Sequence, residues 1–324
     1  MADILRFNNF RLDLQNDEGQ RFNLLDDISF SLPEGKALGI VGESGCGKSI
    51  TSLAVMRLLP AAAQVVGGDV YLKGMNLMKK TEQEMHEIRG KEVAMIFQDP
   101  LTCLNPVLTV GFQIGEAIKR HNPNDSAADI KEQTLSLLKR VGIPNPDKRI
   151  KNYPHQFSGG MRQRTMIAMA IACSPGLLIA DEATTALDVT IQAQVLDLMM
   201  RLKEGGSFMF ITHNLGIVAE VCDEVTVMYA GQIVEAGMVE EVFLHPAHPY
   251  TKGLLLALPT LSSTGKKLYN IPGVVPSVQN FTPGCRYAPR CDYAKPVCSE
   301  HKPVRCVLND NHHVACYLYE EVKT

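Results

Sequence analysis

The sequence predicts an α/β fold with a mainly parallel sheet, a helical insertion and a loop-rich C-terminal extension. Short apolar runs alternate with amphipathic segments through residues 1–240, which is typical of layered α/β domains. Residues 100–155 carry few strand signals, and the last part of the chain is rich in proline and cysteine. We therefore expect a first domain over residues 1–240, with a helical subdomain at about 100–155, and an extension over residues 241–324.

The individual elements follow from hydrophobic periodicity. Compact apolar runs bounded by polar or glycine residues fit strands that are buried on both faces of a parallel sheet. The expected strands are Lys36–Val41, Glu92–Phe97, Leu177–Ala180, Ser207–Thr212 and Val225–Tyr229. Helical spacing of apolar residues predicts helices over Val189–Lys203 and, in the insertion, Lys131–Val141. After Gly237 prolines become frequent, so we expect few regular elements there.

Composition and charge exclude several classes of protein. Hydrophobic residues make up 45% of the chain and charged residues 21%, as in ordinary globular proteins. The net charge of -3 disfavours a strongly basic nucleic-acid binder. No apolar run approaches the roughly 18 residues that span a bilayer, and the first residues lack the pattern of a signal peptide. We expect the chain to stay in the cytosol unless a partner holds it at a membrane.

A glycine-rich segment predicts a phosphate-binding loop. Gly42-Glu-Ser-Gly-Cys-Gly-Lys48-Ser49 has the spacing Gly-x-x-x-x-Gly-Lys-Ser/Thr, between a predicted strand and the helical run Ile50–Leu59. Backbone N–H groups and the helix N-terminus would bind phosphate, the lysine would reach the β- and γ-phosphates, and the serine hydroxyl would bind Mg²⁺. The alternative is an ordinary glycine-rich turn. The candidate ATP-binding residues are Gly42, Ser44, Gly45, Cys46, Gly47, Lys48, Ser49 and Ile50.

Two carboxylates follow a buried strand further along the chain. The strand Leu177–Ala180 ends in Asp181 and Glu182, at a sheet edge where parallel strands place their functional residues. Asp181 suits the Mg²⁺ shell, and Glu182 suits a general base that polarises the attacking water. Taken alone, the pair is equally consistent with two solvated acids at a strand end.

A second helix N-terminus is also suited to an anion. Phe157-Ser158-Gly159-Gly160-Met161 opens a helix expected to run to about Ala172, with Ser158 as its N-cap. The two glycines leave the first backbone donors accessible. An ordinary capped helix explains the same pattern, so this motif alone does not predict an anion site. Its order relative to the other motifs decides its interpretation.

The order of these motifs resembles that of ATP-binding-cassette (ABC) ATPases over about residues 1–240. The phosphate loop is followed by Gln98 at a strand end, the helical insertion, the signature at Ser158, the acidic pair, Asp188 and His213. Two positions depart from the family pattern. Ala183 stands where proline is usual, and Phe22 is the nearest aromatic residue for stacking on adenine.

The resemblance implies a role for each motif. In this family two cassettes face head to tail, with ATP between the phosphate loop of one and the signature (Ser158, Gly159, Gly160) of the other. Gln98 would sense the γ-phosphate and the water, His213 would hold the γ-phosphate and orient Glu182, and Asp188 would lie at the dimer interface. The Mg²⁺ ligands would be Ser49, Gln98 and Asp181.

The C-terminal part resembles the extension of oligopeptide and dipeptide importer ATPases. The segments that carry this resemblance are 245–252, 271–277 and 284–291. It implies an ATPase that powers peptide uptake from the cytoplasmic face of the membrane, with nickel importers as close relatives. The implied partners are transmembrane permease subunits, a second ABC ATPase that is identical or related and, indirectly, an extracytoplasmic peptide-binding protein.

The cysteines of the extension predict a metal site in a reducing compartment. Their spacing lacks Cys-x-x-Cys pairs, which disfavours a zinc knuckle, and it also lacks the ordinary ferredoxin spacings. From the number of cysteines, the reducing compartment and the basic residues among them we expect a 4Fe-4S cluster, with zinc and free thiols as alternatives. The family's last cysteine, in a His-x-Val-x-Cys context, corresponds to Cys316, which leaves Cys306 as the spare. The expected ligands are Cys285, Cys291, Cys298 and Cys316.

Five basic residues are interleaved with these cysteines. We expect them to offset the negative charge of the cluster and to lower the thiol pKa values. They are Arg286, Arg290, Lys295, Lys302 and Arg305. Because the phosphate loop lies in another part of the sequence, we also expect ATP binding to be independent of the cluster.

Two other functions compete with the importer ATPase. A soluble ABC ATPase that acts on nucleic acid or ribosomes usually carries a second cassette, a coiled-coil insertion or a strongly basic surface, and none is evident here. We therefore expect no nucleic-acid partner. An iron–sulfur protein that uses the cassette only as a scaffold would not need Lys48, Glu182 and His213.

Overall fold

The computed structural model describes residues 2–183, 189–203, 206–258 and 269–320. The chain forms two compact units, residues 1–78 with 210–324 and residues 79–209. The α/β class predicted from the sequence is confirmed, and the five predicted strands are all present. One of them, β8 (Ser207–Thr212), contains the point at which the chain returns from the second unit to the first.

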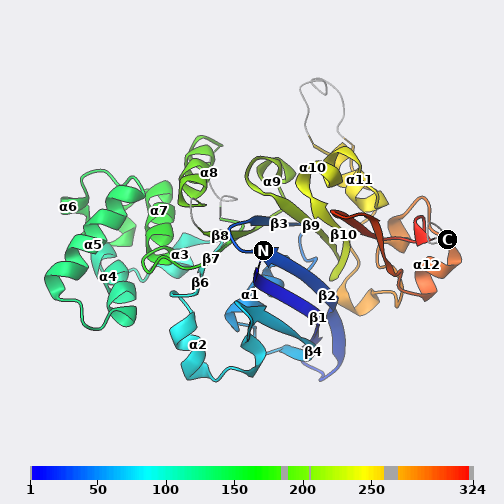
Figure 1. Cartoon of the computed structure of the whole chain (residues 1–324), viewed down its shortest axis with the longest axis horizontal. Coiled ribbons are helices and arrows are strands. Elements are labelled where there is room, and N and C mark those ends of the chain that lie inside the picture. Colours follow the sequence, from blue (N-terminus) through cyan, green and yellow to red (C-terminus); the bar gives the residue numbers. More distant parts are fainter. Residues whose placement is uncertain (1, 184–188, 204–205, 259–268, 321–324) are drawn as a thin grey trace. The chain divides into compact units, whose positions relative to one another are not determined.

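The first unit begins with an antiparallel sheet that the sequence analysis did not predict. Its strand order is β2-β1-β4-β5. Leu5, Phe7, Phe10 and Leu12 of the first strand are buried, with a break in the alternation between Phe7 and Phe10. Phe7 stacks on Phe30 with ring centroids 4.7 Å apart. Figure 1 shows these strands in blue, beside the N-terminus. Their bounds are β1 Asp3–Gln15, β2 Arg21–Pro33, β4 Ala63–Leu72 and β5 Met75–Asn76.

A second sheet in this unit carries the phosphate loop. Its strands follow the order β11-β12-β10-β9-β3, and β3 pairs with β9 in parallel, from Leu38 with Glu224 to Val41 with Val227. All residues of β3 are buried, as expected for a strand covered on both faces. The strands are β3 Ala37–Val41, β9 Glu224–Tyr229, β10 Gln232–Met238, β11 Arg305–Asn309 and β12 His312–Ala315.

The extension contains more regular structure than the sequence predicts. Its two strands, β11 and β12, pair antiparallel and join the sheet at β10. The helices of the first unit are α1 Lys48–Met56, α9 Leu215–Val221, α10 Val239–Leu244, α11 Pro249–Leu256 and α12 Pro296–Glu300. In the described ranges, no helix combines the length and apolar character needed to cross a bilayer.

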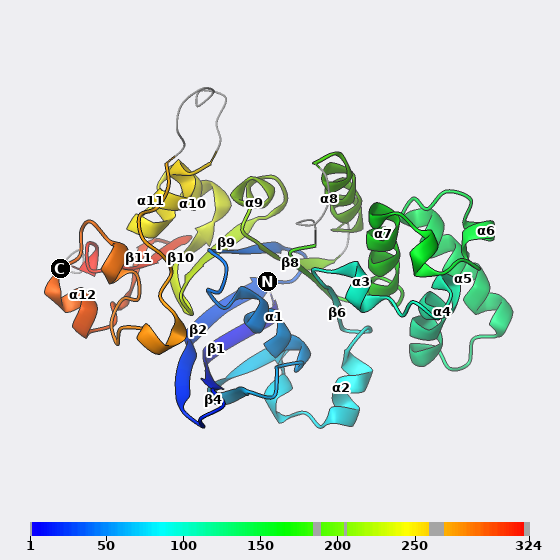
Figure 2. The ribbon, with the colours of Figure 1, turned by 180° about the vertical axis from the view of Figure 1, so that it is seen from behind.

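The second unit combines a buried strand pair with a group of helices. β6 (Val93–Ile96) and β7 (Leu177–Asp181) pair in parallel and are entirely buried. The predicted insertion is helical, and Figure 2 shows its green helices gathered beside α7. The helices are α2 Glu82–Ile88, α3 Pro100–Cys103, α4 Val110–His121, α5 Ala127–Arg140, α6 Pro146–Arg149, α7 Gly159–Ala170 and α8 Val189–Lys203.

Candidate nucleotide-binding site and cysteine site

The phosphate loop, residues 42–49, joins β3 to α1 as the sequence predicts. Gly42, its first glycine, packs closely against the neighbouring strand β9: a Cβ on Gly42 would come within 2.1 Å of the Met228 carbonyl oxygen. Gly47 has a φ of 100° and caps α1, where a Cβ would meet the Leu25 side chain at 2.5 Å. Larger residues at either position would force the loop away from its neighbours.

The side chain of Lys48 lies along the loop. It is 4% exposed, and its Nζ donates hydrogen bonds to the carbonyl oxygens of Gly42 at 2.8 Å and Glu43 at 3.0 Å. Cys46 is fully buried beside it, and burial raises the pKa of its thiol. Among the other predicted loop residues, Ser44 and Gly45 are exposed, and Ser49 and Ile50 are half-buried. The loop therefore combines an exposed tip at Ser44 and Gly45 with a buried lysine and a helix N-terminus, which are the elements of a phosphate-binding loop.

The sequence analysis missed the residues that support this loop. Arg290 of the extension forms a two-pronged ion pair with Glu43, with distances of 2.7 Å from Nη1 to Oε2 and 3.2 Å from Nη2 to Oε1. The Glu43 backbone N–H donates to the hydroxyl of the buried Tyr250 at 2.8 Å. No local sequence pattern predicts this contact, because 247 positions separate Arg290 from Glu43.

In the second unit, the structure brings two predicted catalytic residues together. Gln98 follows β6, and its amide donates to Glu182 Oε2 at 3.1 Å. Asp181, at the end of β7, is only 7% exposed. Glu182 has a left-handed backbone with a φ of 45°, an unfavourable geometry for a residue other than glycine. Such a geometry turns its side chain out of the strand and toward the Gln98 amide.

The signature segment begins α7 and contacts the same acidic region. Ser158 is the N-cap, and its side chain accepts from the Met161 N–H at 3.4 Å, as predicted. Ser158 and Gly159 are exposed, and Gly160 packs near Ile191 of α8. Gln163 of the same helix is buried and donates to the Ala183 carbonyl at 2.7 Å. The helix that displays the signature is thus tied to the residue that follows Glu182.

Three further predicted residues are His213, Asp188 and Phe22. His213 is exposed at the end of β8, in the first unit. Asp188 lies outside the described residues. Phe22, named for adenine stacking, is half-buried in β2, opposite Leu14 of β1.

The four predicted cysteine ligands line one cavity in the extension. Cys285, Cys291, Cys298 and Cys316 share it with Tyr287 and His248. We call these four cysteines and their cavity the cysteine site. The fifth cysteine, Cys306, does not line this cavity. It is buried in a small core with Ala247 and Val314, against which Cys316 also packs, and its Sγ donates to the Val304 carbonyl.

The cysteine side chains are not gathered tightly. In the part of the chain that is described, no three His, Cys, Asp or Glu side chains are grouped so that they could hold a metal ion. The Cys285 N–H donates to the Cys298 carbonyl at 2.7 Å, which fixes two of the cysteines by their backbone. The donor set is nevertheless that of a soft metal: four thiols facing one cavity.

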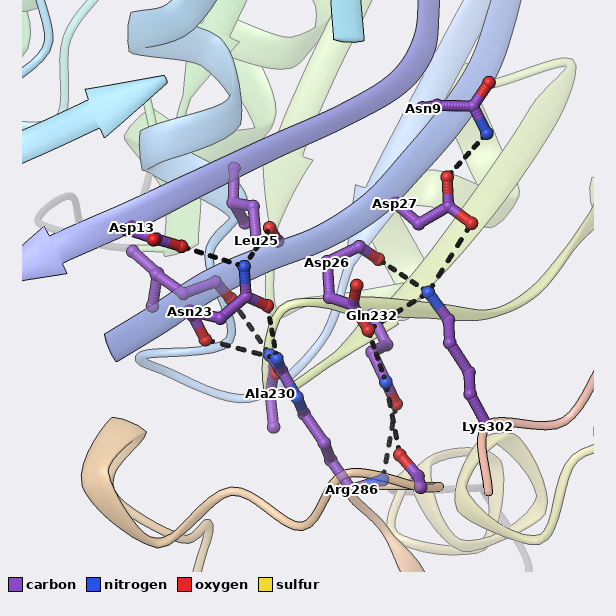
Figure 3. Close-up of polar contacts among 12 residues, drawn as sticks. Asn9, Asp13, Asn23, Leu25, Asp26, Asp27, Ala230, Gln232, Arg286 and Lys302 are labelled. Atoms are coloured by element: carbon purple, nitrogen blue, oxygen red, sulfur yellow. Dashed lines mark hydrogen bonds and ion pairs between the residues drawn. The ribbon is translucent and has the colours of Figure 1, made fainter. Parts of the chain in front are cut away.

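Four of the five interleaved basic residues bind partners outside the cysteine site, and their offsetting of a cluster's charge stays a prediction. Arg290 binds Glu43, Lys302 lies 3.1 Å from Asp26, and Arg305 donates to the Ser29 carbonyl. Arg286 donates to the carbonyls of Leu24 and Ala230 and to Asn23, so the extension is fastened to β2 (Figure 3). Of the five, only Lys295 lines the cysteine cavity.

The predicted lowering of the thiol pKa values is wrong for Cys285, Cys291 and Cys316. Burial raises the pKa of Cys285 to about 12, and it raises the pKa of Cys291 and Cys316 as well. The neighbouring thiols add to the effect, because each thiolate would repel the next. In the absence of a metal these thiols are protonated at neutral pH, and a metal must displace their protons in order to bind.

Comparison with known proteins identifies both parts of the chain. Residues 25–185 match the family described as ABC transporter, and residues 234–298 match the C-terminal region of oligopeptide/dipeptide transporters. The chain is 52% identical over 302 residues to the probable peptide ABC transporter ATP-binding protein y4tR of Sinorhizobium fredii, which covers 92% of this chain and 90% of the relative. It is 50% identical over 297 residues to the dipeptide transport ATP-binding protein DppD of Bacillus subtilis, covering 91% and 88%.

A solved structure shares the fold. The ATP-binding cassette MJ0796, determined as a dimer in a post-hydrolysis state with ADP and Pi, aligns with a TM-score of 0.65 at 23% identity. The alignment covers 72% of this chain and 98% of that cassette. The ABC resemblance inferred from the motif order is therefore confirmed. The chain belongs to the ATP-binding proteins of ABC transporters, in the group that carries the oligopeptide/dipeptide transporter C-terminal region.

Proposed function

We propose that the chain is the ATP-hydrolysing subunit of an importer for dipeptides or oligopeptides. One observation carries the proposal: a phosphate loop with its buried lysine lies on the same chain as an extension of the oligopeptide/dipeptide transporter type. The relatives named for peptide or dipeptide transport match nearly the whole chain, and the extension is included in the match. A nickel importer is the nearest alternative.

Each predicted site residue has its own part in the chemistry of ATP hydrolysis. Lys48 leaves the loop carbonyls to bind the β- and γ-phosphates, and the N-terminus of α1 binds the remaining phosphate oxygens. Ser49, Gln98 and Asp181 offer the oxygen ligands that Mg²⁺ prefers, and the ion neutralises charge on the phosphates when bound. Glu182 polarises the attacking water. Gln98 donates a hydrogen bond to the Glu182 carboxylate and so holds this carboxylate in place.

Hydrolysis requires a second cassette. Ser158, Gly159 and the start of α7 are exposed, so they are available to the nucleotide of a partner. In this arrangement His213 would hold the γ-phosphate. The membrane partners are permease subunits at the cytoplasmic face, which receive peptide from an extracytoplasmic binding protein. Gln98 and the helical insertion form the docking region.

Purification of the native complex tests this function. We expect permease subunits and a second cassette to copurify with the chain, and the reconstituted complex to hydrolyse ATP faster when a peptide-loaded binding protein is added. Dipeptides and Ni²⁺ are compared as substrates in the same assay. Stimulation by Ni²⁺ alone would replace peptide by nickel, and copurification with ribosomes without permease would reject the importer.

We further propose that the cysteine site holds a 4Fe-4S cluster with a structural or regulatory role. The support is that the four cysteines chosen from the sequence line one cavity while Cys306 lies in another core. The cluster would supply no step of phosphoryl transfer, since that reaction moves no electrons. Bound to four thiolates, it would tie together the segments of the extension that carry the four cysteines.

Metal analysis of anaerobically purified protein tests the cluster. We expect a brown protein with about four irons and four sulfides per chain. Cys298→Ser should bleach it, because a hydroxyl is a poorer ligand for iron than a thiolate. Cys306→Ser is the matched control and should stay brown. Stoichiometric zinc without iron would establish the zinc alternative, and a colourless Cys306→Ser would overturn this choice of ligands.

A further inference from the structure

The extension contacts the phosphate loop at Glu43. Its carboxylate is bound by both terminal nitrogens of Arg290, its N–H by the Tyr250 hydroxyl, and its carbonyl by Lys48. The Arg290 side chain is 5% exposed and that of Glu43 is 31% exposed, so the ion pair is largely shielded from solvent. A two-pronged guanidinium–carboxylate pair also fixes orientation, which a lysine would not do.

Arg290 is itself held by the extension. Its Nε donates to the Pro272 carbonyl at 2.8 Å, and Nη2 lies 3.3 Å from the Ile271 carbonyl. The guanidinium carbon lies 5.7 Å from the ring centre of Tyr229 and 5.9 Å from that of Tyr287. The position of the Arg290 guanidinium therefore depends on the position of the extension.

The same short segment forms a wall of the cysteine site. Residues 285–291 are compact: the Arg290 N–H donates to the Tyr287 carbonyl at 2.9 Å, and the Cys291 N–H donates to the Ala288 carbonyl at 3.2 Å. Tyr287 lines the cysteine cavity, and its ring lies 5.3 Å from that of Tyr250. A shift of Cys291 or Tyr287 therefore shifts both groups that hold Glu43.

We propose that Arg290 is a positioning residue of the phosphate loop and that, through it, nucleotide affinity depends on the state of the cysteine site. The proposal rests on nucleotide binding at this loop, as argued above. Without Arg290, the carboxylate of Glu43 would stand unneutralised beside the site of a triphosphate and would repel it. This reverses the expectation from the sequence that ATP binding is independent of the cluster.

The coupling is reciprocal by thermodynamic necessity. If the cysteine site favours the nucleotide-bound conformation of the loop, bound nucleotide stabilises the cysteine site in turn.

Other contacts of the extension serve as controls. Lys302, which pairs with Asp26 and Asp27 of β2, fastens the extension to the same unit without touching the loop (Figure 3). Its loss should affect the fastening but not the loop.

The first experiment measures MgADP affinity by calorimetry on the full-length protein. We expect Arg290→Gln to weaken binding about tenfold, Arg290→Lys to weaken it less, and Lys302→Gln to leave it unchanged. Glu43→Gln in the Arg290→Gln protein should restore most of the affinity, since no unpaired carboxylate remains. A purely structural role predicts no such rescue. Additive effects of Glu43→Gln and Arg290→Gln would therefore overturn the positioning role.

The second experiment links the loop to the cysteine site. Cys291→Ser should weaken MgADP binding, whereas Cys306→Ser, the same substitution outside the cavity, should not. In the Arg290→Gln background Cys291→Ser should have no further effect, because the link is already broken. Thermal unfolding verifies that each variant is folded. Unchanged affinity in folded Cys291→Ser protein would overturn the coupling, whereas wild-type protein that fails to bind MgADP would instead reject the proposed function.

Discussion

Glu182→Gln is expected to lower steady-state ATP hydrolysis at least about 100-fold while ATP still binds. The amide preserves the size of the side chain, and its oxygen can still accept the hydrogen bond that Gln98 donates to Oε2. It lacks the basicity needed to polarise water. With hydrolysis blocked, the ATP-bound pair of cassettes should accumulate, and size-exclusion chromatography with MgATP should show a dimer.

Two controls make this result specific. Glu132→Gln removes the same charge from an exposed position on α5 and should leave turnover unchanged. Gln98→Ala should lower turnover less than Glu182→Gln, because the carboxylate that polarises the water remains. Near wild-type hydrolysis by the Glu182→Gln protein would show that another residue is the general base.

Lys48→Ala should act earlier, at nucleotide binding. The substitution removes the only positively charged side chain of the phosphate loop. We therefore expect the dissociation constant for ATP to rise at least about 100-fold. Filter binding or calorimetry with ATP is the measurement. The helix N-terminus alone would still attract phosphate weakly, so residual binding at millimolar ATP is consistent with the proposal.

The matched control lies at the other end of the same strand. Lys36 precedes β3 and pairs with Asp223 at 3.5 Å, and Lys36→Ala changes the net charge by the same amount. Its affinity for ATP should equal that of the wild type. Undiminished affinity in the Lys48→Ala protein would remove this lysine from the site, whereas equal losses in both variants would indicate a general effect of charge.

Much of the fold is encoded in short-range patterns. The strand β3, the loop 42–49 and the helix α1 follow each other within twenty residues, and each is marked by its own residues: an apolar run, glycines and helical spacing. The same holds for the N-cap at Ser158. The sheet of β1, β2 and β4 was missed because register shifts, such as that between Phe7 and Phe10, interrupt the alternation that marks a strand.

The sequence by itself determined the order of the motifs and hence the family, because spacing and residue type carry that information locally. Only the tertiary structure decided which side chain each charge meets. Arg290 meets Glu43 across 247 positions, and Arg286 meets Asn23 across 263. A guanidinium in a loop can pair with any carboxylate or carbonyl within its reach. Packing of the extension on β2 and on the β9–β10 turn selects the partner, and no local pattern records that choice.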